Sequence, residues 1–182
     1  MPPERLPQNL LRHATRFRLH LECANQSKYE YGEMKNPNDA EIDQLNSFLR
    51  GELSAVETYT QCIKKLDDTD LCVRLGHLRA SHAARVDLLT ARVAASGGAP
   101  DSSSGAWGSF AKFAEGGAGI FGSSAAIAML EEGEDHGKSV YLANLGDLSA
   151  SNRQFINAEI LPEQLRTHDL LAAIIEVRGL EH

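Results

Sequence analysis

The chain has 182 residues, 42% of them hydrophobic, and a formal net charge of -7 at pH 7, which fits one globular domain with extensions and a real core. The negative charge argues against nucleic acid as the main partner, because phosphate binding needs clustered Lys and Arg. We also expect a cytoplasmic protein without a membrane span, since the sequence has no run of about 18 apolar residues, no signal peptide and only three irregularly spaced cysteines.

The two ends of the chain are predicted to lie outside the main domain, which we place at residues 36–178. Residues 1–35 carry apolar side chains at helical spacing among arginines, which indicates a short amphipathic helix. This helix is either a docking segment for a partner or acidic surface, or a weakly anchored extension. Residues 179–182 are consistent with an expression-tag remnant and are excluded from the argument.

The first long helix is predicted over residues 42–66, after a turn at residues 36–39. Its apolar residues recur every three or four positions, as one face of a bundle helix requires. Glu52 interrupts this series at a position that should point into the core. A buried, unpaired carboxylate costs several kcal/mol, roughly, so Glu52 should be neutral, hydrogen-bonded or bound to a cation.

The second long helix is predicted over residues 71–95, and the tight turn at 67–70 makes it an antiparallel neighbour of the first. His82 takes one inward position in its apolar stripe. The link that follows is rich in Gly and Ser up to about residue 122, and its Trp107, Phe110 and Phe113 indicate a short helix that covers part of the bundle. A link this long can cross the whole bundle, so we expect the next helix to run parallel to the second.

The third and fourth helices are predicted over residues 123–145 and 152–178. Glu131 and Glu134 fall beside the apolar stripe of the third helix. Gln164 and His168 lie among the inward residues of the fourth, where Pro162 should kink the helix or mark its effective start. All four helices thus contribute polar groups to the core near mid-length, and facing carboxylates and imidazoles are what a helical bundle uses to hold a divalent transition metal.

A weak internal repeat supports this convergence. Tyr59 follows Glu52 by seven residues, and Tyr141 follows Glu134 by the same interval. Two helical hairpins related by an approximate two-fold axis would place these groups around one centre.

Several short motifs carry a resemblance to known families: Leu45-Asn46, Gly51-Glu52-Leu53, Arg79-Ala80-Ser81-His82, Gly97-Gly98-Ala99-Pro100, Gly105-Ala106-Trp107-Gly108, Leu130 to Gly137, and Leu161-Pro162-Glu163-Gln164 followed by His168. The first two, together with Leu49 and Tyr59, resemble the first helix of bacterioferritin-type and rubrerythrin-type proteins. The whole set is most similar to an uncharacterised bacterial family of ferritin-like bundles, over roughly residues 40–176. The resemblance implies an all-α, antiparallel four-helix bundle with a long crossover between helices 2 and 3.

The same resemblance implies a metal-binding protein that handles iron or carries out iron-dependent oxidation in stress physiology, with iron or manganese as the metal. In the di-iron pattern a Glu precedes each ligand His by three residues. Arg79 and Leu165 stand at those positions here, so the site is incomplete. The implied ligands are Glu52, His82, Glu131, Glu134 and His168, with Tyr59, Arg79, Tyr141 and Gln164 around them. They should hold one metal, and a second only weakly, and the double change Arg79→Glu with Leu165→Glu should raise occupancy.

The alternative is a degenerate bundle without metal. In it Arg79 pairs with Glu52 or Glu134, and the histidines hydrogen-bond the remaining carboxylates. Such a chain would act as a non-catalytic interaction or self-association module, so enzymatic activity stays open and a homo-oligomer is one expected form. Cage-type iron storage ranks lower, because the sequence indicates no fifth helix.

Overall fold

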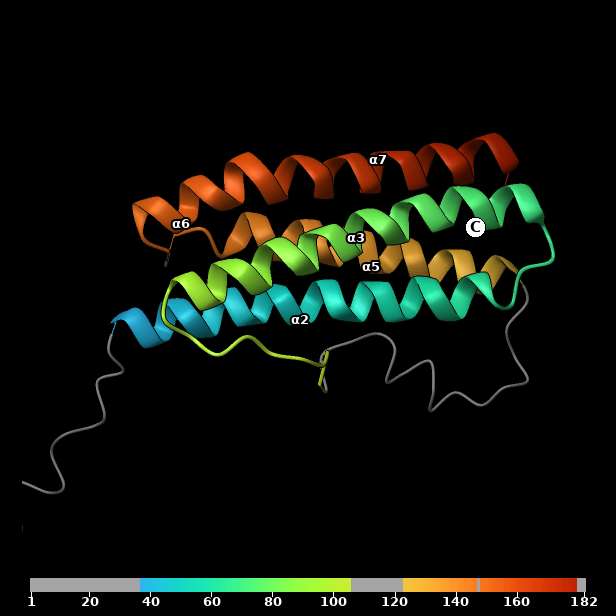
Figure 1. Cartoon of the computed structure of the whole chain (residues 1–182). Coiled ribbons are helices and arrows are strands. Elements are labelled where there is room, and N and C mark those ends of the chain that lie inside the picture. Colours follow the sequence, from blue (N-terminus) through green and yellow to red (C-terminus); the bar gives the residue numbers. More distant parts are fainter. Residues whose placement is uncertain (1–36, 106–122, 147, 180–182) are drawn as a thin grey trace, which may run out of the picture. The chain divides into compact units, whose positions relative to one another are not determined.

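All regular structure in the computed structural model is helical over the described residues, which are 37–105, 123–146 and 148–179 (Figure 1). The all-α prediction is confirmed for this part of the chain. The expected helix within residues 1–35 and the aromatic segment around Trp107, Phe110 and Phe113 lie outside the described residues, as do residues 180–182. None of the helices in the described ranges is long and apolar enough to cross a membrane.

The first helical pair is α2 (Pro37–Ile63) and α3 (Thr69–Ala95). The side chain of Asp68 caps α3 by accepting a hydrogen bond from the amide of Leu71 at 3.0 Å. Beyond the end of α3, Gly97 adopts a φ of 83°, and a Cβ on Gly98 would come within 2.5 Å of Ile42. The two glycines therefore end the helix and let the chain pass close to the start of α2.

The second half of the structure contains α5 (Ser123–Ala143), α6 (Ala150–Phe155), the π-helix η1 (Ile156–Ile160) and α7 (Leu161–Arg178). The amide of Leu161 bonds to the carbonyl of Ile156, one residue further back than in an α-helix. Buried Asn152 and Gln164 are twelve residues apart over three turns, where α-helical geometry needs about eleven. The π turn just before Pro162 thus shifts the inward face of α7 by one residue.

Contacts between the helices follow a regular order along the chain. On α2 and α5, Cys62 lies against Ala126, Tyr59 against Glu134 and Glu52 against Tyr141. Along α3 and its N-cap Asp68, Arg178 of α7 contacts Asp68 and Asp70, Glu163 of α7 contacts Ser81, and Asn152 of α6 contacts Arg92. In both pairs the residue numbers rise on one helix as they fall on the other.

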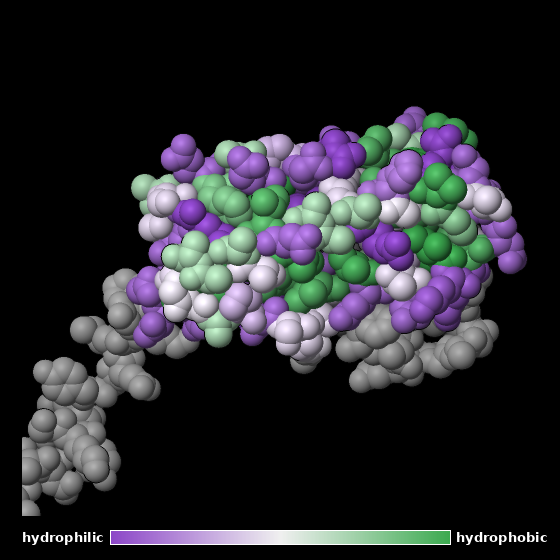
Figure 2. Space-filling model, viewed as in Figure 1, coloured by the Kyte–Doolittle hydropathy of each residue, from purple (hydrophilic) through white to green (hydrophobic). Residues whose placement is uncertain are grey.

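The core consists of two apolar clusters with a polar layer between them. One cluster includes Tyr59, Leu75, Ile127 and Leu171, and the other includes Leu45, Leu89, Tyr141 and Ile156. On the face drawn in Figure 2, hydrophobic residues gather in patches in the middle and toward one end, with hydrophilic residues around and between them. The polar layer at mid-length is where the candidate site lies.

Candidate functional site

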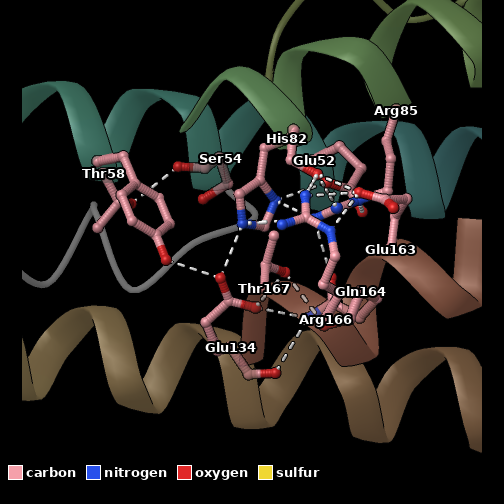
Figure 3. A network of polar contacts seen from close by, with 12 residues as sticks. Glu52, Ser54, Thr58, His82, Arg85, Glu134, Glu163, Gln164, Arg166 and Thr167 are labelled. Atoms are coloured by element: carbon pink, nitrogen blue, oxygen red, sulfur yellow. Dashed lines mark hydrogen bonds and ion pairs between the residues drawn. The ribbon is translucent and has the colours of Figure 1, made fainter. Parts of the chain in front are cut away.

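Six polar side chains from four helices fill the layer between the apolar clusters, and each is at most 3% exposed. They point toward one another in Figure 3. Helix α2 provides Glu52 and α5 provides Glu134. The other two helices each provide two side chains spaced i, i+3: His82 and Arg85 from α3, and Gln164 and Thr167 from α7.

His82 bridges the two carboxylates. Its Nδ1 lies 2.7 Å from Oε2 of Glu52, and its Nε2 lies 2.9 Å from Oε1 of Glu134. Burial lowers the pKa of His82, but the charge of Glu52 and the hydrogen bonds to both carboxylates outweigh burial and raise the pKa above its usual value. Because carboxylates only accept hydrogen bonds, His82 can donate to both of them only in the imidazolium form, which the raised pKa favours.

Arg85 brings a second cation into the same layer. Its Nε lies 2.9 Å from Oε1 of Glu52, and its guanidinium donates to Oε1 of Gln164 at 3.2 Å and to Oγ of Ser81 at 3.0 Å. The guanidinium also lies against the His82 ring, with Nη2 2.5 Å from Nδ1. Burial raises the pKa of Glu52, but His82 and Arg85 outweigh it and bring that pKa down to about 2.

The carboxylate of Glu134 is hydrogen-bonded to side chains from all three of the other long helices. It accepts from Tyr59 at 2.7 Å, His82 at 2.9 Å, Gln164 at 2.8 Å and Thr167 at 3.0 Å. Burial raises its pKa, but the hydrogen bond from His82 and the other donors outweigh burial and hold the pKa below the usual value. Glu134 is therefore ionised at neutral pH.

The repeated Glu and Tyr residues meet across the two helices. Tyr59 of α2 donates to Glu134 of α5, and Tyr141 of α5 donates to Glu52 of α2 at 2.7 Å. Burial and the facing carboxylate raise the pKa of each tyrosine well above 10, so both phenols stay protonated. The seven-residue interval seen in the sequence is thus the spacing that lets each phenol reach the carboxylate of the other helix.

The charges of the layer cancel. Glu52 and Glu134 are ionised, Arg85 is cationic, and protonated His82 supplies the second positive charge. Buried charges are stable when they are paired and hydrogen-bonded. Every charge of this layer is paired with a protein group, but the Nε of Arg85, although it lies 2.9 Å from Oε1 of Glu52, makes no hydrogen bond to any described residue.

Folding stability should fall as the pH rises above about 6.5, the usual pKa of His82. The raised pKa of His82 contributes stability that is complete below the unfolded value and is lost as the pH passes the folded value, by about 1.4 kcal/mol per unit of difference. The lowered pKa values of Glu52 and Glu134 act oppositely, with stability present above about pH 4.5 and lost toward pH 2. Urea midpoints measured from pH 2 to 9 check both pH dependences.

A surface histidine, His168, also has a raised pKa and needs a control. The fall in folding stability with rising pH should persist in the His168→Gln variant and weaken in the His82→Gln variant. An equally steep dependence in the His82→Gln variant, or none in the parent, would assign the titration elsewhere.

The structure brings together three of the five predicted ligands, Glu52, His82 and Glu134, and leaves two outside. His168 has a side chain 19% exposed, and its ring nitrogens lie 2.9 Å from Asp135 and 2.9 Å from Asp169. His168 therefore lies outside the layer, and the expectation that it shares one site with His82 is wrong. Glu131 is half-buried, one turn before Glu134, and the contacts of the layer go to Glu134.

Two of the four predicted surrounding residues, Tyr59 and Tyr141, lie beside the carboxylates, and Gln164 belongs to the layer itself. Arg79 is exposed, so the expectation that it lies around the ligands is wrong, and Leu165 is half-buried. The arginine that enters the core is Arg85, because it lies one turn after His82 on the side of α3 that also buries Leu78 and Leu89. Neither Arg85 nor Thr167 was predicted from the sequence, although their i, i+3 spacing from His82 and Gln164 was an available signal.

Comparison with known proteins identifies a family. Residues 40–146 match the model of a domain of unknown function, DUF2383. The chain belongs to the DUF2383 family. No curated protein matches it. The family match agrees with the predicted resemblance to an uncharacterised helical family and has no bearing on the bacterioferritin and rubrerythrin resemblance.

The donor set of the DUF2383 chain does not fit a di-iron centre. Such centres take one Glu from each of two helices and a Glu-x-x-His pair from each of the other two. Glu52 and Glu134 match the first requirement, but the two pairs read His82-x-x-Arg85 and Gln164-x-x-Thr167. His82 and Gln164 therefore stand where the pattern has Glu, and Arg85 and Thr167 stand where it has His.

The remaining donors are also engaged with each other. Both nitrogens of His82 are hydrogen-bonded to carboxylates, on opposite sides of the ring. Over the described ranges, no group of three or more His, Cys, Asp or Glu residues is arranged to hold a metal ion. What this layer can do chemically is hold a neutral, fully paired set of buried charges.

Proposed function

We propose that this DUF2383 chain is a metal-independent, ferritin-like helical module that acts by binding rather than by iron chemistry. The proposal includes the antiparallel four-helix arrangement with a crossover between α3 and α5. It is supported by the opposed contact order of α2 with α5 and of α3 with α7. A cytoplasmic location, self-association and the lack of a nucleic-acid partner belong to the same proposal.

The observation that carries the proposal is the buried ion pair between Arg85 and Glu52. Arg85 supplies, from within the chain, positive charge at the level where ferritin-like proteins place metal ions. Two unit charges about 4 Å apart repel by roughly 4 kcal/mol at an effective dielectric constant near 20, so Arg85 works against any cation at this level. His82 adds to the same effect while it is protonated.

A second candidate function is favoured by the convergence of Glu52, His82 and Glu134. These are metal-binding residue types, and a protein that handles iron, or uses iron or manganese in oxidation under stress, would bind the ion between them. Such binding requires His82 to give up at least one carboxylate contact. It also requires Arg85 to move away, or the attraction of the carboxylates for the metal ion to exceed the repulsion between that ion and Arg85.

Metal analysis separates the two candidates. We expect protein purified without chelator or nickel affinity to contain substoichiometric iron and manganese, and to stay so after loading with ferrous iron. A content near one ion per chain that survives gel filtration would overturn the metal-independent proposal and support the second candidate.

The variant Arg85→Ala should become sensitive to metal. Removing the guanidinium leaves Glu52 without its Arg partner and opens space beside His82. Manganese or cobalt at about 100 times its Kd would then stabilise the variant by about 2.7 kcal/mol, because only the folded state binds the ion. Melting temperatures with and without metal measure this effect.

The matched control is Arg74→Ala, which removes an exposed arginine of the same helix that pairs with Asp70. Parent and control should show no shift with metal. An equal shift in all three proteins would mean that the metal acts elsewhere.

A further inference from the structure

A cavity of about 400 Å³ lies between α2 and α5 and reaches down to the polar layer. Ligand pockets measure roughly 300–1,000 Å³, so this cavity has the size of a small-molecule site. Four of the residues that line it belong to the buried layer: Glu52, His82, Glu134 and Gln164.

Two neighbouring stripes of α2 form one wall of the cavity. Each stripe has four residues spaced three or four positions apart: Phe48, Glu52, Ala55 and Tyr59 in one, and Ser47, Gly51, Ser54 and Thr58 in the other. Residues at this spacing lie on one face of a helix. The first stripe carries the buried carboxylate and two aromatic rings, and the second carries three hydroxyl groups.

The wall on α5 is mainly apolar. Met129, Leu130 and Val140 provide apolar side chains, while Gly133 and Gly137 leave space because they have none. A dry cavity of about 150 Å³ holds a benzene molecule, so this larger cavity has room for one ring and a polar group attached to it.

The charges at the base of the cavity cancel, which disfavours an ionic ligand of either sign. A cation is attracted by Glu52 and Glu134 but repelled by Arg85 and protonated His82, and for an anion the two effects are reversed. Either ion also loses its hydration when it leaves water. An uncharged ligand avoids both the repulsion and most of this loss.

Some acceptors that line the cavity are still available. Glu134 accepts four hydrogen bonds and has no acceptor site left. Glu52 accepts from His82 and Tyr141, so its two oxygens keep acceptor capacity. Tyr59 and Tyr141 donate their protons to carboxylates and keep oxygen lone pairs.

The available donors that line the cavity are hydroxyl groups. The side chains of Ser47 and Ser54 make no hydrogen bond to any described residue, and Thr58 uses only the carbonyl of Ser54, at 2.8 Å. The Nε of Arg85 is also without a hydrogen bond to the described residues, but it lies 2.9 Å from Oε1 of Glu52, and Arg85 is not among the described residues that line the cavity. A bound molecule therefore meets the serine hydroxyls and not the guanidinium.

We propose that this cavity binds a small, uncharged aromatic alcohol. Its hydroxyl group pairs with the unused groups of Ser54 and Glu52, and its ring lies against Phe48, Met129 and Val140. A hydroxyl both donates and accepts hydrogen bonds, so it matches serine hydroxyls and a carboxylate without adding a charge to the balanced layer. The inference rests on the proposed function and names the class of ligand that this metal-independent binding module takes.

Three fragments of similar size but different charge test the inference on the full chain at pH 6: benzyl alcohol, benzylamine and benzoate. NMR titration should give benzyl alcohol a Kd in the millimolar range, with benzylamine and benzoate each at least about tenfold weaker. Binding of either ion as tightly as the alcohol would overturn the inference, because the balanced charges would then not select the ligand.

Two cavity-filling variants test the location, one on each wall. Ala55→Leu enlarges a half-buried side chain of α2, and Gly133→Leu adds one on α5 at a position where a Cβ meets nothing within 4 Å. Each should weaken benzyl alcohol binding at least about tenfold. The matched control, Gly76→Leu on α3, also has nothing within 4 Å of an added Cβ and should bind as the parent does.

The variant Ser54→Ala tests the hydrogen bond to the ligand. Loss of one net hydrogen bond, worth roughly a factor of five in affinity, should weaken benzyl alcohol binding by about that factor. Unchanged binding in Ser54→Ala would overturn the inference, since the hydroxyl of the ligand would then not pair with this serine.

Parent-like binding in both Ala55→Leu and Gly133→Leu would place the alcohol elsewhere and overturn the inference. Metal content measured on the same preparation keeps the two proposals apart. A metal-free protein that binds no benzyl alcohol contradicts only the cavity inference, whereas stoichiometric metal contradicts the proposed function.

Discussion

A variant with His82→Glu, Arg85→His, Gln164→Glu and Thr167→His is expected to bind about two divalent transition-metal ions per chain, where the parent binds none at stoichiometric level. These four changes restore a Glu-x-x-His pair on α3 and another on α7. Together with Glu52 and Glu134 they complete the donor set of a di-iron centre.

The expectation follows from the observed layer. All four positions are buried at the same level as Glu52 and Glu134, and they project from helices that already face each other. The substitutions also remove the Arg85 guanidinium and raise the number of carboxylates to four, so the negative charge attracts metal instead of a protein cation.

The measurement is metal content after loading with manganese or cobalt, together with the cobalt absorption spectrum. The matched control is Arg79→Glu with Leu165→Glu, which adds carboxylates one turn away from His82 and His168. Arg79 is exposed and Leu165 is half-buried, so this control should gain no metal, in contrast to the gain in occupancy expected from the sequence alone. If the folded four-fold variant binds no more metal than this control, the correspondence between this layer and a di-iron centre is wrong.

Most of the first two helices could be predicted from the sequence, because their apolar residues keep a regular helical period. Glu52 and His82 are the residues that break those two apolar stripes, and both are buried where the period places them. The same period predicted the inward positions of Tyr59 and Tyr141. In a regular helix the spacing of residues in the sequence determines which way their side chains point, and the inward positions of both tyrosines were predicted correctly for this reason.

The fourth helix was harder for a physical reason. The π turn of η1 adds a residue before Pro162, and α7 then buries the polar positions Gln164 and Thr167 in line with Leu171 and Ile175. The alternative stripe through Leu161, Leu165 and His168 is more apolar at its start, so hydrophobicity favours the wrong face. Tertiary pairing with Glu134 decides the register, and no local pattern contains that information.

Arg85 was missed because arginine is almost never fully buried unless it is paired. Its partner Glu52 is thirty-three residues away on another helix, so the pair becomes visible only when α2 and α3 are placed side by side. Once Glu52 is known to be buried, a compensating cation on a facing helix is required, and the inward positions of α3 offer His82 and Arg85. The sequence therefore indicates that a buried Glu52 needs a compensating cation, but it does not indicate which residue supplies that cation.

The last expected result concerns Glu134, which we expect to be the most costly carboxylate of α5 to remove. Glu134→Ala should lower the free energy of unfolding by about 3–5 kcal/mol, the usual cost of breaking a buried ion pair from one side. The loss is large because four donors, from Tyr59, His82, Gln164 and Thr167, are left without their acceptor. The cations His82 and Arg85 would then face only Glu52.

Urea unfolding at pH 6 measures this loss, and Glu132→Ala is the matched control. Glu132 is the same residue type on the same helix, two positions earlier, and it is exposed. Removing a carboxylate at such a position changes stability by about 0.5 kcal/mol or less. A similar small loss in both variants would mean that the hydrogen bonds to Glu134 contribute little, and the buried charge layer would then not be what holds α5 against α3 and α7.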